Sequence, residues 1–399
     1  MTVINIEIPS IIPRTDIFDI ILIKLLLSLD LINLYASNKC IYLLYHSELV
    51  ERIIMRNQII SEEHSNTIIL KWPSMHKNKD DWLDLLNLYI EIISFLLEKR
   101  VCVILAENLK SNFIDDILSI NKKIDFDLNS IITLKINTND IWIRDYGPFM
   151  LLDNITNKYF ILDYNYNAYG EKYSYDKDNE FTHYFFKYLN KNNYKIFTKR
   201  IFNKIFIEGG NIIYNKFTYI LNKNCLQNTN KKFLWSEIKE ELDYGFNDNN
   251  LSSYFVLDIE NIAGDDTNGH IDNLVRLYKD NLLYMSCKDI EHPDYYILKE
   301  LENQIKLMVK KMPFIKNIIE IEHNANDIIY YNNKILPFSY LNFINVANNV
   351  LIPIHSNTKN KTITKLKGLF NKSSIKFINS NSLLRELGGL HCCSLNWKL

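Results

Sequence analysis

Short runs of apolar, often β-branched residues alternate with longer amphipathic segments from residue 68 onward. The runs Ile68–Leu70 and Val101–Leu105 flank a segment, from about residue 80 to 99, in which apolar residues recur at helical spacing. Further strands are predicted on the same grounds at residues 160–163, 219–221, 254–257, 282–285 and 350–352. This alternation, which no obvious linker interrupts, is typical of a mixed α/β protein.

Residues 1–50 are predicted to form an N-terminal extension of one or two helices. The sequence gives no indication of its role. Residues 51–399 are expected to form a single domain. The segments 222–232 and 357–361 are rich in Asn and Lys and are predicted to be polar surface loops. Charged residues interrupt the apolar stretch 17–34 short of the ~18 uncharged residues that a membrane-spanning helix needs.

Charge and cysteine usage narrow the range of partners and compartments. The chain carries 46 Lys+Arg against 47 Asp+Glu, a formal charge of −1, so a polyanion meets no broad basic surface and nucleic acid is not expected as a partner. A membrane partner is not expected either. The six cysteines show no C-x-x-C spacing, and the N-terminus lacks the basic start of a secretory signal. A cytoplasmic protein is predicted.

Glycine is scarce, at 10 of 399 residues against the roughly 7% of average proteins. Each remaining glycine is therefore expected to serve a need of the backbone. Eight of the ten fall in short clusters: Gly147, Gly170, Gly209, Gly210, Gly264, Gly269, Gly388 and Gly389. Most of these clusters contain side chains capable of chemistry, namely Asp145, Glu208, His270, Asp272 and Cys392.

These side chains also recur at a nearly constant step. Asp145 and Glu208 are 63 residues apart, Glu208 and His270 are 62 apart, and His270 and Cys392 are 122 apart, about twice that step. A repeat architecture gives such spacing when each unit delivers one residue to a shared axis. The skipped step falls near Tyr331, close to the run Ser339-Tyr340-Leu341-Asn342.

This set of side chains suits a guanidinium group, which is planar, permanently charged and matched by carboxylates in its plane. Asp145 and Asp272 could clamp the group while the thiolate of Cys392 attacks its central carbon. His270 would protonate the departing ammonia and then activate the water that hydrolyses the covalent intermediate. Glu208 would hold the substrate or orient His270.

Each element also has a simpler structural explanation. A lone cysteine such as Cys392 is most often a small buried apolar residue, and Arg144 with Asp145 could form a structural ion pair. The His-x-Asp pair would share one face of a strand and could make a core hydrogen bond, while Glu208–Asn211 could be a tight turn. The presence of all five elements in this order along one chain favours a catalytic role over a chance combination.

Cys393 directly follows the candidate nucleophile. Successive side chains of extended backbone point to opposite faces, so only one of the two cysteines can face a site shared with His270. Cys393 is therefore expected to face away and to pack as a small apolar group, without a disulfide to Cys392.

With these motifs, residues 68–397 resemble the agmatine deiminase family, in the branch related to bacterial-type peptidylarginine deiminases. The runs 142–148 and 264–273 are the most specific. The other matching segments are residues 70–73 with 81–82, 163–173, 208–211, 336–343 and 388–393. The sequence departs from the family at Tyr169, where the family has Trp, and at residues 59–64, where a Trp-Glu-Pro-like opening is missing.

The resemblance implies a five-bladed α/β propeller of ββαβ units in one catalytic domain, residues 51–399, with no metal and no organic cofactor. By position, Cys392 matches the nucleophile, His270 the acid/base, Asp145 and Asp272 the guanidinium clamp, and Glu208 a further carboxylate. Substrate contacts are also expected from four residues: Trp142, Tyr169, Asn211 and Gly389.

The resulting hypothesis is hydrolysis of a small guanidinium substrate, agmatine, to N-carbamoylputrescine and ammonia, a step towards putrescine. Deimination of free or peptidyl arginine would use the same chemistry. Free arginine brings an α-carboxylate, which Arg144 or Arg276 near the motifs could receive. A binding protein without enzymatic activity is the alternative from another class, and homo-oligomerisation is left open by the sequence.

Overall fold

The computed structural model describes residues 57–74, 78–120, 124–153, 156–194, 196–200, 204–248 and 253–399. They belong to one compact unit, Asn57–Leu399, and the rest of the chain, Met1–Arg56, is a separate unit. The helices predicted within residues 1–50 lie outside the described residues.

Five sheets of the described chain share one topology, in which the first two strands are antiparallel and the second and third are parallel. They are β19 (Ser394–Trp397), β2 (Thr67–Lys71) and β3 (Cys102–Glu107); β5 (Phe149–Asp153), β6 (Lys158–Asp163) and β7 (Ile196–Arg200); β8 (Ile212–Tyr214), β9 (Tyr219–Asn222) and β10 (Tyr254–Leu257); β11 (Val275–Tyr278), β12 (Asn281–Ser286) and β13 (Asn317–Glu322); β16 (Ile344–Val346), β17 (Asn349–Ile354) and β18 (Ser374–Asn379). β4 (Ile131–Lys135) extends the first sheet, β1 (Asn57–Ile59) extends the second, and β14 (Ile329–Tyr331) pairs with β15 (Lys334–Leu336).

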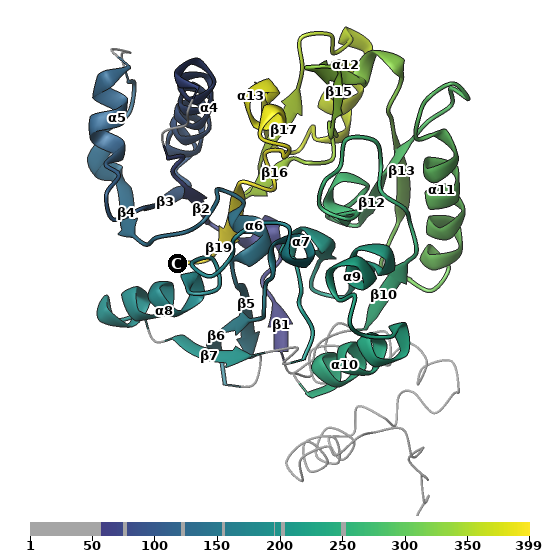
Figure 1. Ribbon diagram of the computed structural model, residues 1–399, viewed down its shortest axis with the longest axis horizontal. Helices are drawn as coiled ribbons and strands as arrows, with labels where there is room; N and C mark the ends of the chain where they lie inside the picture. The colour runs from purple at the N-terminus through teal and green to yellow at the C-terminus, as the bar shows by residue number, and fades with distance from the viewer. Residues whose placement is uncertain are drawn as a thin grey trace, which may run out of the picture. The chain divides into compact units, whose positions relative to one another are not determined.

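Helices connect the parallel strands, as parallel pairing requires. The connections are α4 (Lys79–Glu98), α7 (Ala168–Glu171) with α8 (Phe181–Lys191), α9 (Lys223–Thr229) with α10 (Trp235–Asp248), α11 (Tyr295–Val309) and α12 (Asn360–Leu369). Figure 1 shows α8, α10, α11 and α12 at the outer side of their strands, with α5 (Phe113–Ser119) beside α4. In the described ranges, no helix has the length and apolar content needed to cross a membrane.

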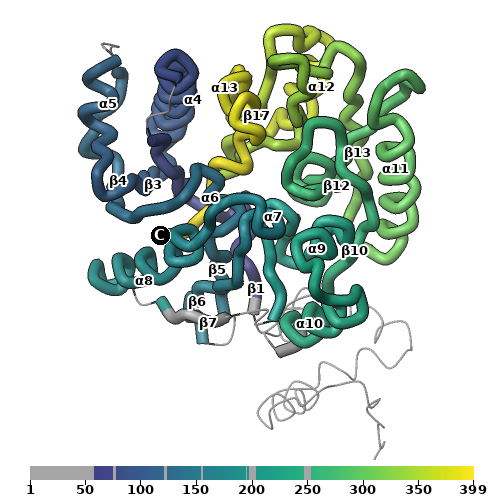
Figure 2. Tube along the Cα trace, in the orientation of Figure 1, coloured from purple at the N-terminus to yellow at the C-terminus, as the bar shows by residue number. Residues whose placement is uncertain are grey.

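The C-terminal strand pairs with the first sheet of the described unit. β19 pairs antiparallel with β2, so that Ser394 lies opposite Leu70 and Trp397 opposite Thr67. In Figure 2 the yellow C-terminal segment runs from α13 (Asn381–Arg385) toward the teal α6 (Ile143–Tyr146). This pairing brings Cys392, two residues before β19, to segments that lie hundreds of residues earlier.

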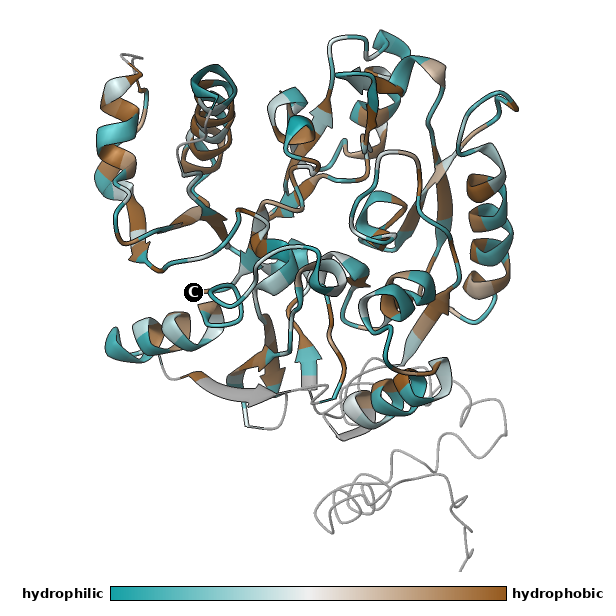
Figure 3. Ribbon diagram, viewed as in Figure 1, coloured by the Kyte–Doolittle hydropathy of each residue, from teal (hydrophilic) through white to brown (hydrophobic). Residues whose placement is uncertain are grey.

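The core forms where strands meet the apolar faces of their helices, as the brown strands and two-coloured helices of Figure 3 show. α4 is representative: Leu86, Tyr89 and Ile93 are fully buried on one face, against Ile68 and Leu105 of the adjoining sheet. Asn78 caps this helix by accepting the main-chain N–H groups of its first turn.

All strands and the helix predicted from apolar periodicity are present. The segments predicted as strands became β2, β3, β6, β9, β10, β12 and β17, and the segment 80–99 became α4. The α/β class is therefore confirmed.

The polar loop predicted at residues 222–232 is wrong, because this segment contains α9. Asn222 caps the helix, and Cys225, Leu226 and Thr229 are buried on its inner face. Asn and Lys on the remaining positions hid this short amphipathic pattern. The second predicted loop, 357–361, is at the surface but ends in the first turn of α12.

The candidate chemical residues lie just ahead of the first strands of four different sheets, and two of them share one sheet. Asp145 in α6 precedes β5, Glu208 precedes β8, His270 and Asp272 precede β11, and Cys392 precedes β19. The fifth sheet follows the same rule, since Asn342 precedes β16. The repeating step seen in the sequence thus reflects one position repeated in five sheets.

We expect Asn222→Ala to lower the free energy of unfolding by about 3 kcal/mol or more, because several buried groups lose their partners. The Asn222 side chain donates to the carbonyls of Ile259 and Gly269 and accepts the Ile259 N–H, within 2.8–3.0 Å. Chemical denaturation measures the change. Asn190→Ala, at an exposed position of α8, is the matched control and should change stability by less than about 0.5 kcal/mol. A loss below about 1 kcal/mol for Asn222→Ala would contradict this role.

Candidate active site

Cys392 lies in a turn at the start of β19, not in the extended backbone that the sequence predicted. Its Sγ is 3.6 Å from Asp272 Oδ2 and 3.2 Å from Asn342 Nδ2, and the residue is 6% exposed. Burial and the negative charges of Asp272 and Asp145 raise the pKa of this thiol well above its usual range. A cation bound between the two carboxylates would oppose this shift and favour the thiolate.

Cys393 packs as expected from the sequence. It is fully buried in the apolar cluster that includes Tyr89 and Leu390, and its Sγ donates to the Leu390 carbonyl. Both neighbouring thiols are free, so no disulfide joins them. The turn, rather than strand alternation, separates the directions of the two side chains.

His270 begins a short 3₁₀ turn, Ile271–Asn273, and not the strand that the His-x-Asp pattern predicted. Its Nε2 is 2.8 Å from Glu208 Oε2, and its buried Nδ1 has no hydrogen-bond partner among the described residues. Burial alone would lower the pKa of His270, but the charge of Asp145 and the hydrogen bonds of the ring with Cys225 and Glu208 raise it well above 6.5. The ring is therefore a cation that offers Nδ1–H for proton transfer.

Glu208 orients His270 and has no free oxygen for a substrate. Thr229 Oγ1 donates to its Oε1 at 2.7 Å, while Cys225 Sγ donates to its Oε2 at 3.2 Å, the oxygen that also accepts from His270. Of the two roles that the sequence left open for Glu208, these contacts favour the second.

Asp145 lies beside the same ring. Its Oδ1 accepts the Gly210 N–H at 2.8 Å and is 3.5 Å from His270 Nδ1, while Oδ2 accepts the Tyr169 hydroxyl at 2.9 Å. Burial, opposed by the positive charge of His270, raises the pKa of Asp145 to about 7. Hydrogen bonds from Gly210 and Tyr169 therefore hold the Asp145 carboxyl in position, and no Lys or Arg among the described residues forms an ion pair with it.

Asp272 is fully buried and has one oxygen available. Oδ2 meets His391 Nδ1 at 2.7 Å, whereas Oδ1 has no hydrogen-bond partner among the described residues. Burial alone would raise its pKa, but the hydrogen bond and charge of His391 lower it. Asp272 is therefore ionised beside the Cys392 thiol, as a clamp for a guanidinium requires.

Two glycines allow the close contacts of the site. A Cβ on Gly210 would lie 2.5 Å from His270 Nδ1 and 2.6 Å from Asp145 Oδ1. A Cβ on Gly389 would collide with Asn342 Oδ1, the atom that accepts the His391 N–H. Close packing against Asn342 therefore requires glycine at position 389, apart from its predicted role as a substrate contact.

Tyr169 is held by an unusual backbone. Ala168, Tyr169, Gly170 and Glu171 all have positive φ, with Tyr169 at φ 60 and ψ 42. This left-handed turn costs about 1–2 kcal/mol per non-glycine residue. It directs the Tyr169 hydroxyl to Asp145 and its ring to His270, with centroids 5.6 Å apart.

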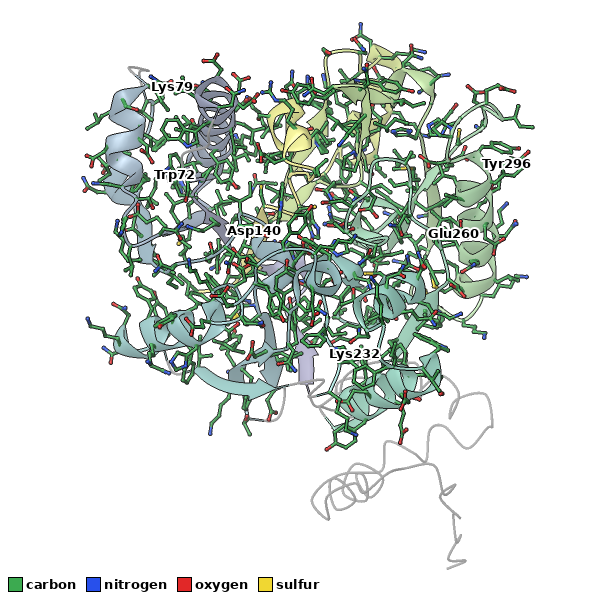
Figure 4. All side chains as sticks on the ribbon, viewed as in Figure 1. Trp72, Lys79, Asp140, Lys232, Glu260 and Tyr296 are labelled. Carbon is green, nitrogen blue, oxygen red and sulfur yellow. The ribbon has the colours of Figure 1, made fainter. Side chains whose placement is uncertain are left out.

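Trp142 and Asn211, the remaining predicted substrate contacts, have different surroundings. Trp142 is partly exposed and packs over Gly388, and Asp140 Oδ1 accepts the main-chain N–H of Trp142. Figure 4 labels Asp140 near the middle of the described part. Asn211 does not join the site, because its side-chain amide is paired with the main chain of Asn222.

Sequence reasoning missed a buried charged group beneath the site. Glu62 contacts Arg276, Arg144 and His391 Nε2, the last at 2.7 Å. These charges lower the pKa of Glu62 far below its usual range, although burial opposes them. Glu62 lies in the segment 59–64, where the sequence showed a departure from the family, and only its acidic character offered a signal.

Asn342 was also missed as a site residue, although its run was expected near the skipped step. Its Nδ2 contacts Asp272 Oδ2 at 3.3 Å and Cys392 Sγ at 3.2 Å. Cys225 and Thr229 of α9 were hidden by the incorrect loop prediction. Glu208, Cys225 and His270 are the one group of the described residues whose three donor atoms could hold a metal ion.

Three comparisons relate this arrangement to known proteins. Residues 60–397 match the family of Porphyromonas-type peptidyl-arginine deiminases. Agmatine deiminase of Pseudomonas aeruginosa is 22% identical over 68% of this chain and 78% of its own length. Among solved structures, a Cys-to-Ser variant of C. jejuni agmatine deiminase with substrate bound is 23% identical and covers 86% of this chain and 96% of its own, with a TM-score of 0.71. Agmatine deiminase of Enterococcus faecalis is 15% identical with the same coverage and a TM-score of 0.68, so the fold is shared.

We expect Glu62→Gln to lower the free energy of unfolding by about 3–5 kcal/mol, because two buried guanidinium groups lose their carboxylate. Denaturant unfolding of the purified variant measures the change. Glu63→Gln is the matched control: its side chain is 25% exposed and accepts one main-chain N–H, from Lys279. Equal stabilities of the two variants would show that Glu62 does not hold these arginines.

Proposed function

The chain belongs to the Porphyromonas-type peptidyl-arginine deiminase family and is a hydrolase that acts on guanidino C–N bonds, and we propose that its substrate is agmatine. The products would be N-carbamoylputrescine and ammonia. Support comes from the clamp: Asp145 and Asp272, both buried, flank a thiol that contacts Asp272. Two carboxylates in a water-poor site favour a substrate with a permanent positive charge.

The direction of two arginines favours agmatine over free arginine, and this observation carries the substrate assignment. Arg276 contacts Glu62 and donates to the carbonyls of Leu341 and Phe343. Arg144 donates to Asn396 and lies 3.7 Å from Glu62. Arg276 is thus engaged by the protein. Arg144 Nη1 has no hydrogen-bond partner among the described residues, but this side chain is 1% exposed and lies against Glu62. Agmatine has no carboxylate that would need either guanidinium.

In the first half of the reaction, the Cys392 thiolate displaces one amino group of the guanidinium as ammonia. Asp145 and Asp272 hold the guanidinium, whose charge lowers the pKa of Cys392, and the thiolate attacks the central carbon. A C–S bond forms, and His270 donates its Nδ1 proton to the departing nitrogen. The C–N bond breaks, ammonia leaves, and the amidino group remains on Cys392.

The second half restores the thiolate. His270, now neutral, takes a proton from water through Nδ1, and the hydroxide adds to the amidino carbon. The C–S bond then breaks, Cys392 leaves as the thiolate, and the hydroxyl proton passes to the solvent as the ureido carbonyl forms and the product is released. Glu208 keeps the ring in position through Nε2 in both halves, so that one nitrogen performs both proton transfers.

Five sheets of one topology, each delivering a residue to the site, support closure as a five-bladed propeller. With agmatine as the substrate, the product would serve a route to putrescine. The sequence favours a cytoplasmic location for this reaction.

Agmatine binding should depend on pH through Asp145. We expect the Cys392→Ala variant, which cannot turn over, to bind agmatine ~10-fold more tightly per pH unit from pH 5 to 7 and equally above that. A raised pKa of about 7 means that the carboxyl is neutral, and a poor clamp, below this value. Calorimetry measures the affinity. Adding Asp145→Asn should leave only a shallower dependence from Asp140, whose pKa burial raises to about 6.

Ammonia release distinguishes the substrates. We expect kcat/KM for agmatine to exceed that for arginine by at least ~100-fold, because an unpaired carboxylate is costly to bury. A blocked arginyl peptide tests the third substrate. Cys392→Ala should abolish release, while Cys393→Ala should keep at least a third of it.

Equal rates on agmatine and arginine would overturn the substrate assignment but not the chemistry. Activity on the peptide alone would favour a peptidylarginine deiminase. Loss of activity with Cys393→Ala and not with Cys392→Ala would displace the nucleophile by one residue.

A further inference from the structure

The side of His270 away from its free Nδ1 holds a thiol that the proposed reaction does not use. Cys225 is on the inner face of α9, is 1% exposed, and its Sγ lies 3.2 Å from Glu208 Oε2. His270 Nε2 lies 2.8 Å from the same oxygen. A carboxylate, a thiol and an imidazole therefore converge in one buried space.

The donor atoms have the spacing of a metal site. One atom from each of Glu208, Cys225 and His270 lies within 4.8 Å of the other two. Zinc binds such donors at about 2.0–2.3 Å, which places tetrahedral ligands about 3.3–3.7 Å apart. The separation of 2.8 Å between His270 and Glu208 would need to open by at least about half an ångström, and that of 3.2 Å between Cys225 and Glu208 by at most about half an ångström.

Charge balance also permits a divalent ion here. Cys225 Sγ and His270 Nε2 both direct a proton at the Glu208 carboxylate. Zinc would take the place of these two protons, so two positive charges would replace two and no uncompensated charge would be buried.

We propose that Glu208, Cys225 and His270 form an inhibitory zinc site behind the catalytic histidine. With zinc on Nε2, the neutral ring keeps a proton on Nδ1 and has no lone pair to accept another. Donating that proton would require an imidazolate. The ring cannot then alternate between acid and base, so zinc blocks both proton transfers. This consequence rests on the proposed function, whereas zinc binding itself does not.

Direct binding is measured with Cys392→Ala as the parent, because it removes the other thiol near His270. We expect calorimetry to give one zinc ion per chain, with about two protons released for each. Co²⁺ should give the near-ultraviolet absorption of a thiolate-bound ion. Adding Cys225→Ser, which keeps a hydrogen-bond donor for Glu208, should weaken zinc binding at least ~100-fold and remove this absorption.

Cys287→Ser is the matched control, since Cys287 is also buried and its Sγ donates to a main-chain carbonyl, that of Asp289. Added to the same parent, it should leave zinc affinity within threefold. In the active enzyme, zinc should inhibit ammonia release, a chelator should restore it, and Cys225→Ser should resist inhibition relative to its own zinc-free rate.

Three results would overturn the proposal: unchanged zinc affinity with Cys225→Ser, loss of binding in the Cys392→Ala parent, or equal loss with Cys287→Ser. Zinc binding that requires Cys225 in an enzyme inactive on every guanidinium substrate would support the site and count against the proposed function instead.

Discussion

The buried charges around Glu62 hold the candidate site together. Glu62 contacts Arg144, His391 and Arg276, and each of these stands beside a chemical residue in the chain. Arg144 precedes Asp145, His391 precedes Cys392, and Arg276 follows Asp272 by four residues. One carboxylate therefore fixes three segments that come from three different sheets. Because its partners are buried, none of these segments can move without separating charges in a low-dielectric interior.

The same network determines the charge of the space above it. Arg276 is engaged by Glu62 and by main-chain carbonyls, and Arg144 lies against Glu62, Asn396 and the His391 carbonyl. Among the described residues of the site, His270 supplies the positive charge beside Asp145. The negative charges of Asp145 and Asp272 exceed the positive charge of His270. This excess of negative charge is unfavourable in a site without water and becomes favourable when a cation enters. Burial, together with the neighbouring carboxylates, raises the pKa values of Asp145 and Cys392.

Much of this arrangement could be predicted from the sequence, because apolar periodicity and the ~62-residue step are local or regular signals. The strands and α4 were found in this way, and the step anticipated that Asp145, Glu208, His270 and Cys392 precede the first strands of different sheets. Glu62 could not be found, since its importance depends on contacts to residues more than 80 positions away. α9 was missed because Asn and Lys cover three of its seven positions, and the buried Cys225 and Thr229 were missed with it.

Glycine scarcity succeeded as a signal for a physical reason. Catalysis on a planar cation needs side chains and main-chain N–H groups closer together than a Cβ allows, as at Gly210 between His270 and Asp145. Gly389 meets Asn342 in the same way, and Asn342 in turn contacts Cys392. A sequence that otherwise avoids glycine cannot replace it at such points without moving the reacting groups. Gly210 and Gly389 therefore lie at contacts between segments that precede different sheets, and a side chain at either position would collide with a residue of the candidate site.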